Sequence, residues 1–391
     1  MSTKLQHQLD LPLKNFELGS LGSFYSIQSR PPARTPPNTT MRTIELCAGA
    51  GGQAIGLHLA GATHTALVEL DPHACATLRK NNDALQLGWG PILEQDLRKF
   101  ASTEAHRYRN SVDLVAGGVP CPPFSKAGKQ LGNNDERDLF PAALEVVERV
   151  RPTAILLENV PGLLETKFKS YRDSIIAKLL ALGYEGEWRL IQASDFGVPQ
   201  LRPRAILIAF RKGLLKHFEW PKPSSEPPPT VGETLFDLMS SKGWKGAIKW
   251  RNRANDIAPT VVGGSHKHGG PDLGPTRAKH KWHSLGVNAH RVGADHEIPE
   301  RTFEGVLLRT GEVRPGFEHL PLLTVRMVAR IQGFPDYWEF SGTKTHAYRQ
   351  VGNAFPPPVA EKLGERIKKV IEEYRSSLSK KATKAGKKEA A

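Results

Sequence analysis

The chain has 391 residues, of which 39% are hydrophobic and 24% charged, with three cysteines and a formal net charge of +14. This composition is typical of a globular protein with one large and one smaller domain, and no apolar run approaches the roughly 20 residues of a membrane span. Three cysteines cannot cross-link a fold of this size and the first residues lack a secretory signal, so we expect a cytoplasmic protein with free thiols.

Residues 1–40 end in RPPARTPPNTT, a Pro- and Thr-rich stretch that predicts a flexible N-terminal arm. From Met41 onward, apolar strand patterns (TIEL, HTALVEL, VDLVA, TAILLEN) alternate with helical ones such as PAALEVVERV. Continuous apolar strands that alternate with helices predict an α/β fold with a mostly parallel, Rossmann-like sheet flanked by helices. We expect this domain to span residues 41–215.

The first predicted strand leads into the glycine-rich segment AGAGGQAIG, which opens a helix. Glycines there let the backbone approach a ligand closely, and the Lys-Ser/Thr of a phosphate-binding P-loop is missing. Glu69 ends the second strand, where a carboxylate can bind both ribose hydroxyls, and Asp96 ends a third, where it can accept from an adenine amino group. The succession favours a nucleoside-bearing cofactor. The alternative is that Glu69 caps a helix, a role for which Asp71 is the better candidate.

The next strand, VDLVA, is followed by GGVPCPPFS, which places Cys121 on a rigid, open turn. A thiolate can add to an activated carbon–carbon double bond if a partner absorbs the charge. Glu158 ends the apolar strand TAILLE, where burial is expected to desolvate it. Arg202 and Arg204, at alternate positions of QLRPR, are expected to point the same way, toward a flat polar ring and a phosphate.

After WPKPSSEPPPT, about a hundred irregular residues, 216–320, predict a smaller domain. Between Lys242 and Arg291 there are ten Lys or Arg against two acids, with three tryptophans in the same span. This pattern predicts a polyanion-binding surface with stacking groups, although a solvated basic face would have the same composition. Four histidines raise the question of a metal site, but no cysteine or acid completes a ligand set, so we expect no metal.

The segment LLTVRMVARIQGF and a final helix return the chain to the first domain over residues 321–375. The apolar face of that helix is expected to pack on the core with Val359, Leu363, Ile367, Val370, Ile371 and Tyr374. The last stretch, SKKATKAGKKEAA, has five lysines and no large apolar side chain. It predicts that residues 376–391 form a disordered basic tail.

Seven segments, taken together and in this order, resemble the DNA (cytosine-5)-methyltransferases: ELCAGAGG, VELDP, GGVPCPPFS, LLENVPG, QLRPR, LTVRMVARIQGFP and QVGNAFPPP. The resemblance implies that residues 41–215 and 321–375 form a catalytic domain that binds S-adenosylmethionine, and that residues 216–320 form a target-recognition domain. It also implies transfer of a methyl group to C5 of a flipped-out cytosine in duplex DNA, through an adduct between Cys121 and C6. A monomer that needs no membrane and acts in a bacterial restriction–modification system, with a cognate endonuclease encoded nearby, fits this family.

The resemblance also carries residue roles. The catalytic residues would be Cys121, Glu158, Arg202 and Arg204, with Arg204 contacting the cytosine and Arg202 holding the loop. The cofactor would contact Leu46, Cys47, Gly49, Gly51, Gly52, Glu69, Leu70, Asp96, Leu97, Pro120, Leu139, Asn353 and Ala354. The DNA would contact Ser125, Lys126, Lys129, Gln130, Trp244, Lys245, Trp250, Arg251, Arg253, His266, Lys267 and Arg277. Cys47 departs from the family, which commonly has an aromatic residue there to stack on adenine.

Two other activities share parts of this pattern. Methylation of RNA would use the same cysteine chemistry. The CPPF turn also resembles that of DNA amino-methyltransferases, but their mechanism needs no covalent nucleophile and gives Glu158 no role. The sequence does not indicate which DNA site is recognised.

Overall fold

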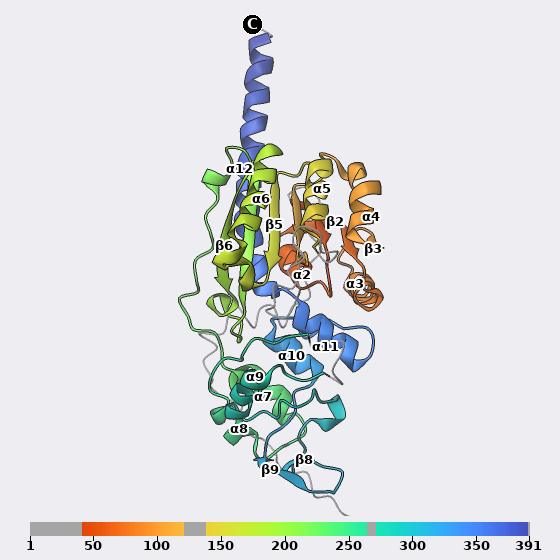
Figure 1. Cartoon of the computed structure of the whole chain (residues 1–391), viewed down its shortest axis with the longest axis vertical. Helices are drawn as coiled ribbons and strands as arrows, with labels where there is room; N and C mark the ends of the chain where they lie inside the picture. Colours follow the sequence, from red (N-terminus) through yellow and green to blue (C-terminus); the bar gives the residue numbers. More distant parts are fainter. Residues whose placement is uncertain (1–40, 121–137, 264–270, 390–391) are drawn as a thin grey trace, which may run out of the picture.

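The computed structural model describes residues 41–120, 138–263 and 271–389, with the backbone alone for 381–389; the predicted arm, residues 1–40, lies outside this range. A seven-stranded sheet with the order β3-β2-β1-β4-β5-β7-β6 dominates the fold (Figure 1). Its strands are β1 (Met41–Leu46), β2 (Ala62–Glu69), β3 (Ile92–Glu94), β4 (Leu114–Gly117), β5 (Ala154–Asn159), β6 (Tyr184–Gln192) and β7 (Pro203–Arg211). Neighbours are parallel except that β7 runs antiparallel to β5 and β6, which confirms the predicted α/β sheet.

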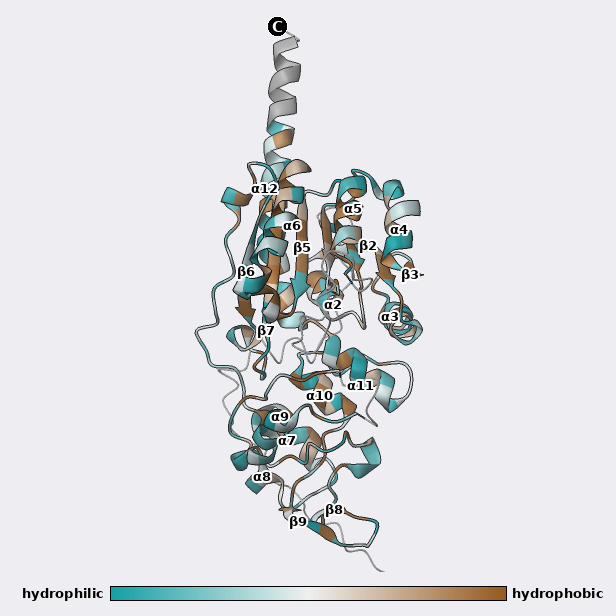
Figure 2. Cartoon of the chain, in the orientation of Figure 1, coloured by the Kyte–Doolittle hydropathy of each residue, from teal (hydrophilic) through white to brown (hydrophobic). Residues whose placement is uncertain are grey.

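Helices cover both faces of the sheet. On one face lie α2 (Gly52–Leu59) and α12 (Pro357–Glu389), and on the other α4 (Leu97–Thr103), α5 (Phe140–Val150) and α6 (Lys169–Ala181). Alternate residues of β5 enter the two cores: Ile155 and Leu157 pack with α4 to α6, whereas Ala154 and Leu156 pack with α2 and α12. A strand buried on both sides has no wet face, which is why its sequence is apolar without alternation (Figure 2).

The C-terminal helix packs closely on α2 because small residues meet at the contact. A Cβ at Gly56 would lie 2.6 Å from the Cβ of Ala360, and one at Gly364 would lie 2.8 Å from that of Ala60. Of the predicted apolar face, all are buried except Tyr374, which is half-buried.

The same helix corrects one prediction, because α12 continues to Glu389 where a disordered tail was expected from residue 376. Alanine, lysine and glutamate in this stretch are strong helix formers. Extending a helix that is already folded requires no new nucleus, so the lack of an apolar face does not end it.

The smaller domain lies below the sheet in Figure 1 and contains α7 (Val231–Ser240), α8 (Ala247–Arg253), α9 (Thr276–Ser284), β8 (Gly305–Leu307) and β9 (Val313–Glu318). Helices α10 (Val325–Ile331) and α11 (Lys344–Asn353) lie between it and the sheet (Figure 1), and α3 (Pro72–Leu85) follows β2.

Three tryptophans form much of the core of this domain. Trp244, Trp250 and Trp282 are 5%, 3% and 0% exposed. The indole of Trp250 donates to the carbonyl of Gly286 at 3.0 Å, and that of Trp244 to the carbonyl of Phe303 at 3.1 Å. The prediction that Trp244 and Trp250 stack on DNA is therefore wrong. These large side chains supply buried apolar area that stabilises a domain with little regular secondary structure.

Candidate active site

The loop between β1 and α2 uses its glycines in two different ways. The backbone is left-handed at Cys47 (φ 51°), Gly49 (φ 53°) and Gly51 (φ 88°), so the chain turns sharply out of the strand. Gly52 instead allows a close approach, because a Cβ there would lie 2.3 Å from the carbonyl oxygen of Phe355. The loop thereby brings the start of α2 against the segment that precedes α12.

Two carboxylates follow the neighbouring strands. The Glu69 side chain, at the end of β2, accepts from the backbone N–H groups of Gly49 (2.7 Å), Leu70 (2.8 Å) and Asp71 (2.8 Å). Asp71 caps α3, as expected from the sequence. Asp96 caps α4 by accepting from the N–H of Arg98 at 2.7 Å. These backbone bonds fix both acids at one edge of the sheet.

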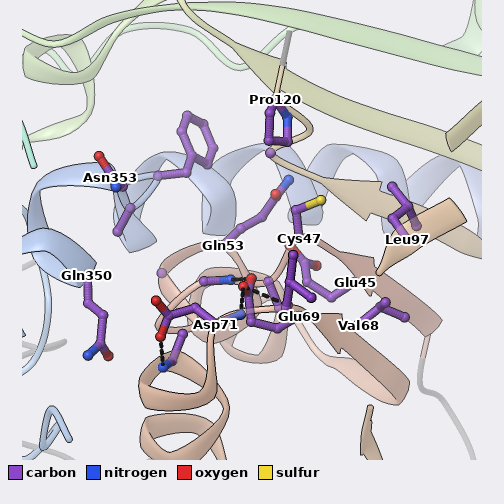
Figure 3. A pocket seen from close by; sticks show the side chains of 18 of the residues that line it. Glu45, Cys47, Gln53, Val68, Glu69, Asp71, Leu97, Pro120, Gln350 and Asn353 are labelled. Carbon is purple, nitrogen blue, oxygen red and sulfur yellow. Dashed lines mark hydrogen bonds between the residues drawn. The ribbon is translucent and has the colours of Figure 1, made fainter. Parts of the chain in front are cut away.

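A cavity of about 590 Å³ opens at this edge (Figure 3). The predicted cofactor residues that line it are Cys47, Gly49, Gly52, Glu69, Leu70, Asp96, Leu97, Pro120, Leu139, Asn353 and Ala354. Leu46 and Gly51 do not line it, so those two predictions are wrong. The Leu46 side chain is wholly buried in the core of the sheet, and Gly51 faces Leu78 and Trp338. Neighbouring residues of one loop can face either the cavity or the core, and the sequence alone does not show which.

Two buried polar side chains of the cavity wall were missed. Glu45 is 1% exposed, and neither of its carboxylate oxygens has a hydrogen-bond partner among the described residues. Burial raises the pKa of Glu45 well above its ordinary value. Gln53 is 4% exposed, and its Nε2 likewise lacks a partner in the described part of the chain. The signal for Glu45 was present in the sequence: an acid inside the apolar strand TIEL, just before the glycine loop.

The two described cysteines are unsuited to act as nucleophiles. Cys47 lines the cavity, but burial and the nearby Glu69 and Asp96 raise the pKa of its thiol. Cys75 is buried in α3, and burial raises the pKa of its thiol to about 12. A thiol that stays protonated is a poor nucleophile.

The segment that carries Cys121 lies outside the described residues, together with Ser125, Lys126, Lys129 and Gln130. Its two flanks are described and are tied to each other. The N–H of Leu139 donates to the carbonyl of Pro120 at 3.1 Å. The amide of Asn159, at the end of β5, donates to the carbonyl of Val119 at 2.8 Å. The chain therefore leaves β4 at a fixed point beside β5.

Glu158, which lines the cavity, forms an ion pair with Arg204. The Nε of Arg204 lies 2.6 Å from Oε1 of Glu158, and the two side chains are only 11% and 12% exposed. Oε2 of Glu158 lies 3.0 Å from where a Cβ of Gly118 would be, so this carboxylate reaches the exit of β4. The expected burial of Glu158 is present, but the acid has a cationic partner.

Arg202 does not point the same way as Arg204. It is fully buried, and its guanidinium donates to the carbonyls of Val261, Gly352 and Ala354. The expectation that the two arginines point the same way is wrong, because Arg202 lies in the loop before β7 and turns into the interior. Its shortest hydrogen bonds go to backbone carbonyls, whereas Arg204 pairs with Glu158.

The residues predicted to contact DNA in the smaller domain differ in how exposed their side chains are. Lys245 and Arg277 are exposed. Arg253 is also exposed but donates to the carbonyl of His283, and Arg251 is half-buried against the ring of Phe236. His266 and Lys267 lie outside the described residues.

The described residues contain no group of three or more His, Cys, Asp or Glu side chains that could hold a metal ion. No helix in the described ranges is long and apolar enough to cross a membrane.

Comparisons with known proteins identify the family. Residues 41–369 match the family model of the C-5 cytosine-specific DNA methylases. The chain is 50% identical over 335 residues to the Type II methyltransferase M.NaeI of Lentzea aerocolonigenes, covering 85% of this chain and 76% of that one. It is 49% identical over 331 residues to the Type II methyltransferase M.NgoMIV of Neisseria gonorrhoeae, covering 84% and 97%.

A solved structure supports the fold: that of the Entamoeba histolytica methyltransferase EhMeth, with a TM-score of 0.55 at 16% identity, covers 84% of this chain and 98% of that one. The chain therefore belongs to the C-5 cytosine-specific DNA methylases, enzymes that transfer a methyl group from S-adenosylmethionine to C5 of cytosine in DNA.

Proposed function

We propose that methyl transfer proceeds through a covalent adduct between Sγ of Cys121 and C6 of a cytosine flipped out of duplex DNA. The observation that carries this proposal is the position of Glu158. Its carboxylate lies in the cavity wall with the candidate cofactor residues, pairs with Arg204, and reaches the exit of the strand that leads to Cys121. The acid, the cofactor cavity and the end of the strand that precedes Cys121 thus lie at one edge of the sheet.

In this mechanism the Cys121 thiolate forms the bond to C6 while Glu158 in its acid form donates its proton toward N3, where the electron pair displaced from the ring accumulates. S-adenosylmethionine, when bound, would supply its methyl group to C5 of the activated ring, its carbon–sulfur bond breaking to leave S-adenosylhomocysteine. Loss of the C5 proton then restores the double bond as the bond to Sγ breaks and Cys121 leaves as the thiolate. Arg204 holds the Glu158 carboxylate in the orientation that this step requires.

The polar side chains of the cavity match the chemistry of S-adenosylmethionine. Glu69 and Asp96 are proposed to bind the ribose hydroxyls and the adenine amino group. Glu45, a buried acid whose oxygens lack partners among the described residues, suits the positively charged end of the molecule. Cys47 is proposed to contact the adenine by packing alone.

The activity is tested with unmethylated phage DNA and S-adenosylmethionine labelled in its methyl group, followed by digestion to nucleosides. Label in 5-methylcytosine is expected; label in N4-methylcytosine or N6-methyladenine would contradict the proposal. Transfer RNA in place of the phage DNA, with the same labelled S-adenosylmethionine, tests the RNA alternative: label in 5-methylcytidine would support that alternative.

The nucleophile is tested with duplex DNA that contains 5-fluorocytosine, because the fluorine blocks release of the adduct. Cys121→Ala is expected to form no adduct while it still binds S-adenosylhomocysteine. The matched control is Cys75→Ala, which removes a buried thiol outside the cavity and should form the adduct normally. An adduct with Cys121→Ala would show that another residue attacks.

We further propose that the enzyme protects host DNA as part of a restriction–modification system, because two similar proteins are named Type II methyltransferases. The exposed Lys245 and Arg277 of the smaller domain are proposed to contact the phosphate backbone. Expression in a strain that lacks methylation, followed by methylation-sensitive sequencing, should show 5-methylcytosine at one short sequence. Methylation scattered over unrelated sequences would exclude the protective role.

A further inference from the structure

A buried arginine joins three parts of the chain that are far apart in the sequence. Arg202, in the loop before β7, donates from Nη1 to the carbonyl of Val261 at 2.6 Å. From Nη2 it donates to the carbonyls of Gly352 (2.8 Å), in the last turn of α11, and Ala354 (2.9 Å), just after it. Val261 belongs to the smaller domain, whereas Ala354 lines the cofactor cavity.

Two glutamines close this network. Oε1 of Gln200 accepts from the N–H of Val261 at 2.8 Å, and its Nε2 donates to Oε1 of Gln332 at 2.6 Å. Nε2 of Gln332 donates in turn to the carbonyl of Ala354 at 2.5 Å. Gln200 and Gln332 are both 0% exposed. Val261 and Ala354 are therefore linked twice: from carbonyl to carbonyl through Arg202, and from the N–H of Val261 to the carbonyl of Ala354 through Gln200 and Gln332.

The charge of Arg202 makes this link unusual. The described residues place no carboxylate within ion-pair distance of its guanidinium, which is balanced by carbonyl oxygens alone. Another buried arginine, Arg330 of α10, has the ordinary arrangement, with Asp237 at 2.5 Å and Asp336 at 2.9 Å. Burying an unpaired cation opposes folding, and an apolar side chain in its place would often be more stable. Stability alone therefore does not account for Arg202.

A second contact connects the same two regions without Arg202. A Cβ at Gly263, just after the Val261 contact, would lie 2.3 Å from Oδ1 of Asn353. Asn353 lines the cavity beside Ala354. The smaller domain thus touches the cavity wall directly at Asn353 and through the guanidinium at Ala354.

We propose that Arg202 is a positioning residue that couples DNA binding by the smaller domain to the cofactor cavity. This inference rests on the proposed cofactor site and on DNA recognition by the smaller domain. When the smaller domain binds DNA and Val261 shifts, the Arg202 guanidinium shifts with it. Its hydrogen bonds then move the backbone at Gly352 and Ala354. Because coupling between two sites is reciprocal, DNA and cofactor each tighten the binding of the other by the same factor.

The test is a binding cycle with S-adenosylhomocysteine and a short duplex that contains the methylated sequence found by sequencing. In the unaltered protein the duplex is expected to tighten S-adenosylhomocysteine binding by a factor in the range of about 5 to 150. In Arg202→Lys this factor should fall to within about twofold of one, because an ammonium group cannot span the three carbonyls as a planar guanidinium does. Binding of S-adenosylhomocysteine without DNA should change by less than about threefold, since Arg202 does not line the cavity.

Arg330→Lys is the matched control, because it alters a buried arginine that contacts neither the cavity nor Val261, and it should keep the coupling. A purely structural role for Arg202 would lower stability and both affinities but leave the coupling factor unchanged, and this result would overturn the proposal. Loss of S-adenosylhomocysteine binding by the unaltered protein would instead refute the proposed cofactor site.

If Arg202→Lys does not fold, Gly263→Ala tests the proposed connection between the smaller domain and the cavity. Its added methyl group displaces Asn353 from the side of the smaller domain, although residue 263 does not line the cavity. S-adenosylhomocysteine binding is expected to weaken by about threefold or more. Unchanged binding by a folded Gly263→Ala would contradict the transmission of position between the two regions.

Discussion

Gly52 and Gly56 lie about one turn apart on α2, and both face the backbone of the C-terminal part of the chain. A Cβ at Gly52 would lie 2.3 Å from the carbonyl oxygen of Phe355, and one at Gly56 would lie 2.2 Å from that of Pro357. Since ordinary contacts begin at 3.4 Å, either alanine forces two backbone segments apart by about 1 Å. From the cost of overpacked cores, each substitution should lower the free energy of unfolding by about 1–3 kcal/mol.

The two variants should differ at the cofactor site. Gly52 lines the cavity beside Ala354 and Phe355, whereas Gly56 does not. Displacement of a binding wall by about 1 Å removes well-placed contacts, so Gly52→Ala should weaken S-adenosylhomocysteine binding by about tenfold or more. Gly56→Ala should weaken it by less than about threefold at a similar loss of stability.

Urea unfolding followed by circular dichroism measures the stability of the two variants, and isothermal titration calorimetry measures their affinity. Unfolding of Gly52→Ala at the same urea concentration as the unaltered protein would contradict the predicted overpacking. An equal loss of affinity in both variants would show a general loosening of α2 rather than a displaced cavity wall.

Three further predictions concern other residues. Glu158→Gln should lower kcat by about 10²- to 10⁴-fold and leave S-adenosylhomocysteine binding nearly unchanged, as measured by single-turnover methylation and calorimetry; an equal loss in both would assign Glu158 to cofactor binding. Trp250→Ala should lower the free energy of unfolding by about 3–5 kcal/mol, since the indole is buried; normal urea unfolding with weakened DNA binding would restore the stacking role. His64 is buried between Oγ1 of Thr43 and the carbonyl of Ala54, and burial lowers its pKa to about 3. Between pH 6.5 and 3, His64 is therefore protonated in the unfolded chain but neutral in the folded protein. Stability should fall over that range as pH falls, by up to about 1.4 kcal/mol per pH unit. His64→Asn should lose this slope in urea titrations, and the exposed control His280→Asn should keep it.

The sequence was a good guide wherever one side chain or one periodicity determines the outcome. Runs such as TAILLEN predict strands buried on both faces because their central residues are apolar without the alternation of a half-exposed strand. Glu69 and Asp96 were predicted as cavity residues because parallel strands bring their carboxyl ends to one edge. Both line the cavity in the structure.

Prediction was poorer where a residue's surroundings come from distant parts of the chain. Trp250 in a basic segment has the composition of a DNA-binding surface, but its burial depends on Gly286 and on a core assembled from many short segments. Arg202 and Arg204 have the same spacing as two neighbours on one face of a strand. Their separation depends on where β7 begins, at Pro203, which the pattern does not fix.

The contact between α2 and α12 joins an element that is synthesised early in the catalytic domain to one that is synthesised about 300 residues later. Until residues near 370 have been synthesised, one face of β1 and α2 has no covering helix, and the wall at Asn353 and Ala354 does not exist. A nascent or truncated chain thus lacks a complete cofactor cavity and exposes an apolar surface that chaperones bind. A complete cofactor cavity therefore requires that two segments about 300 residues apart in the sequence fold onto each other.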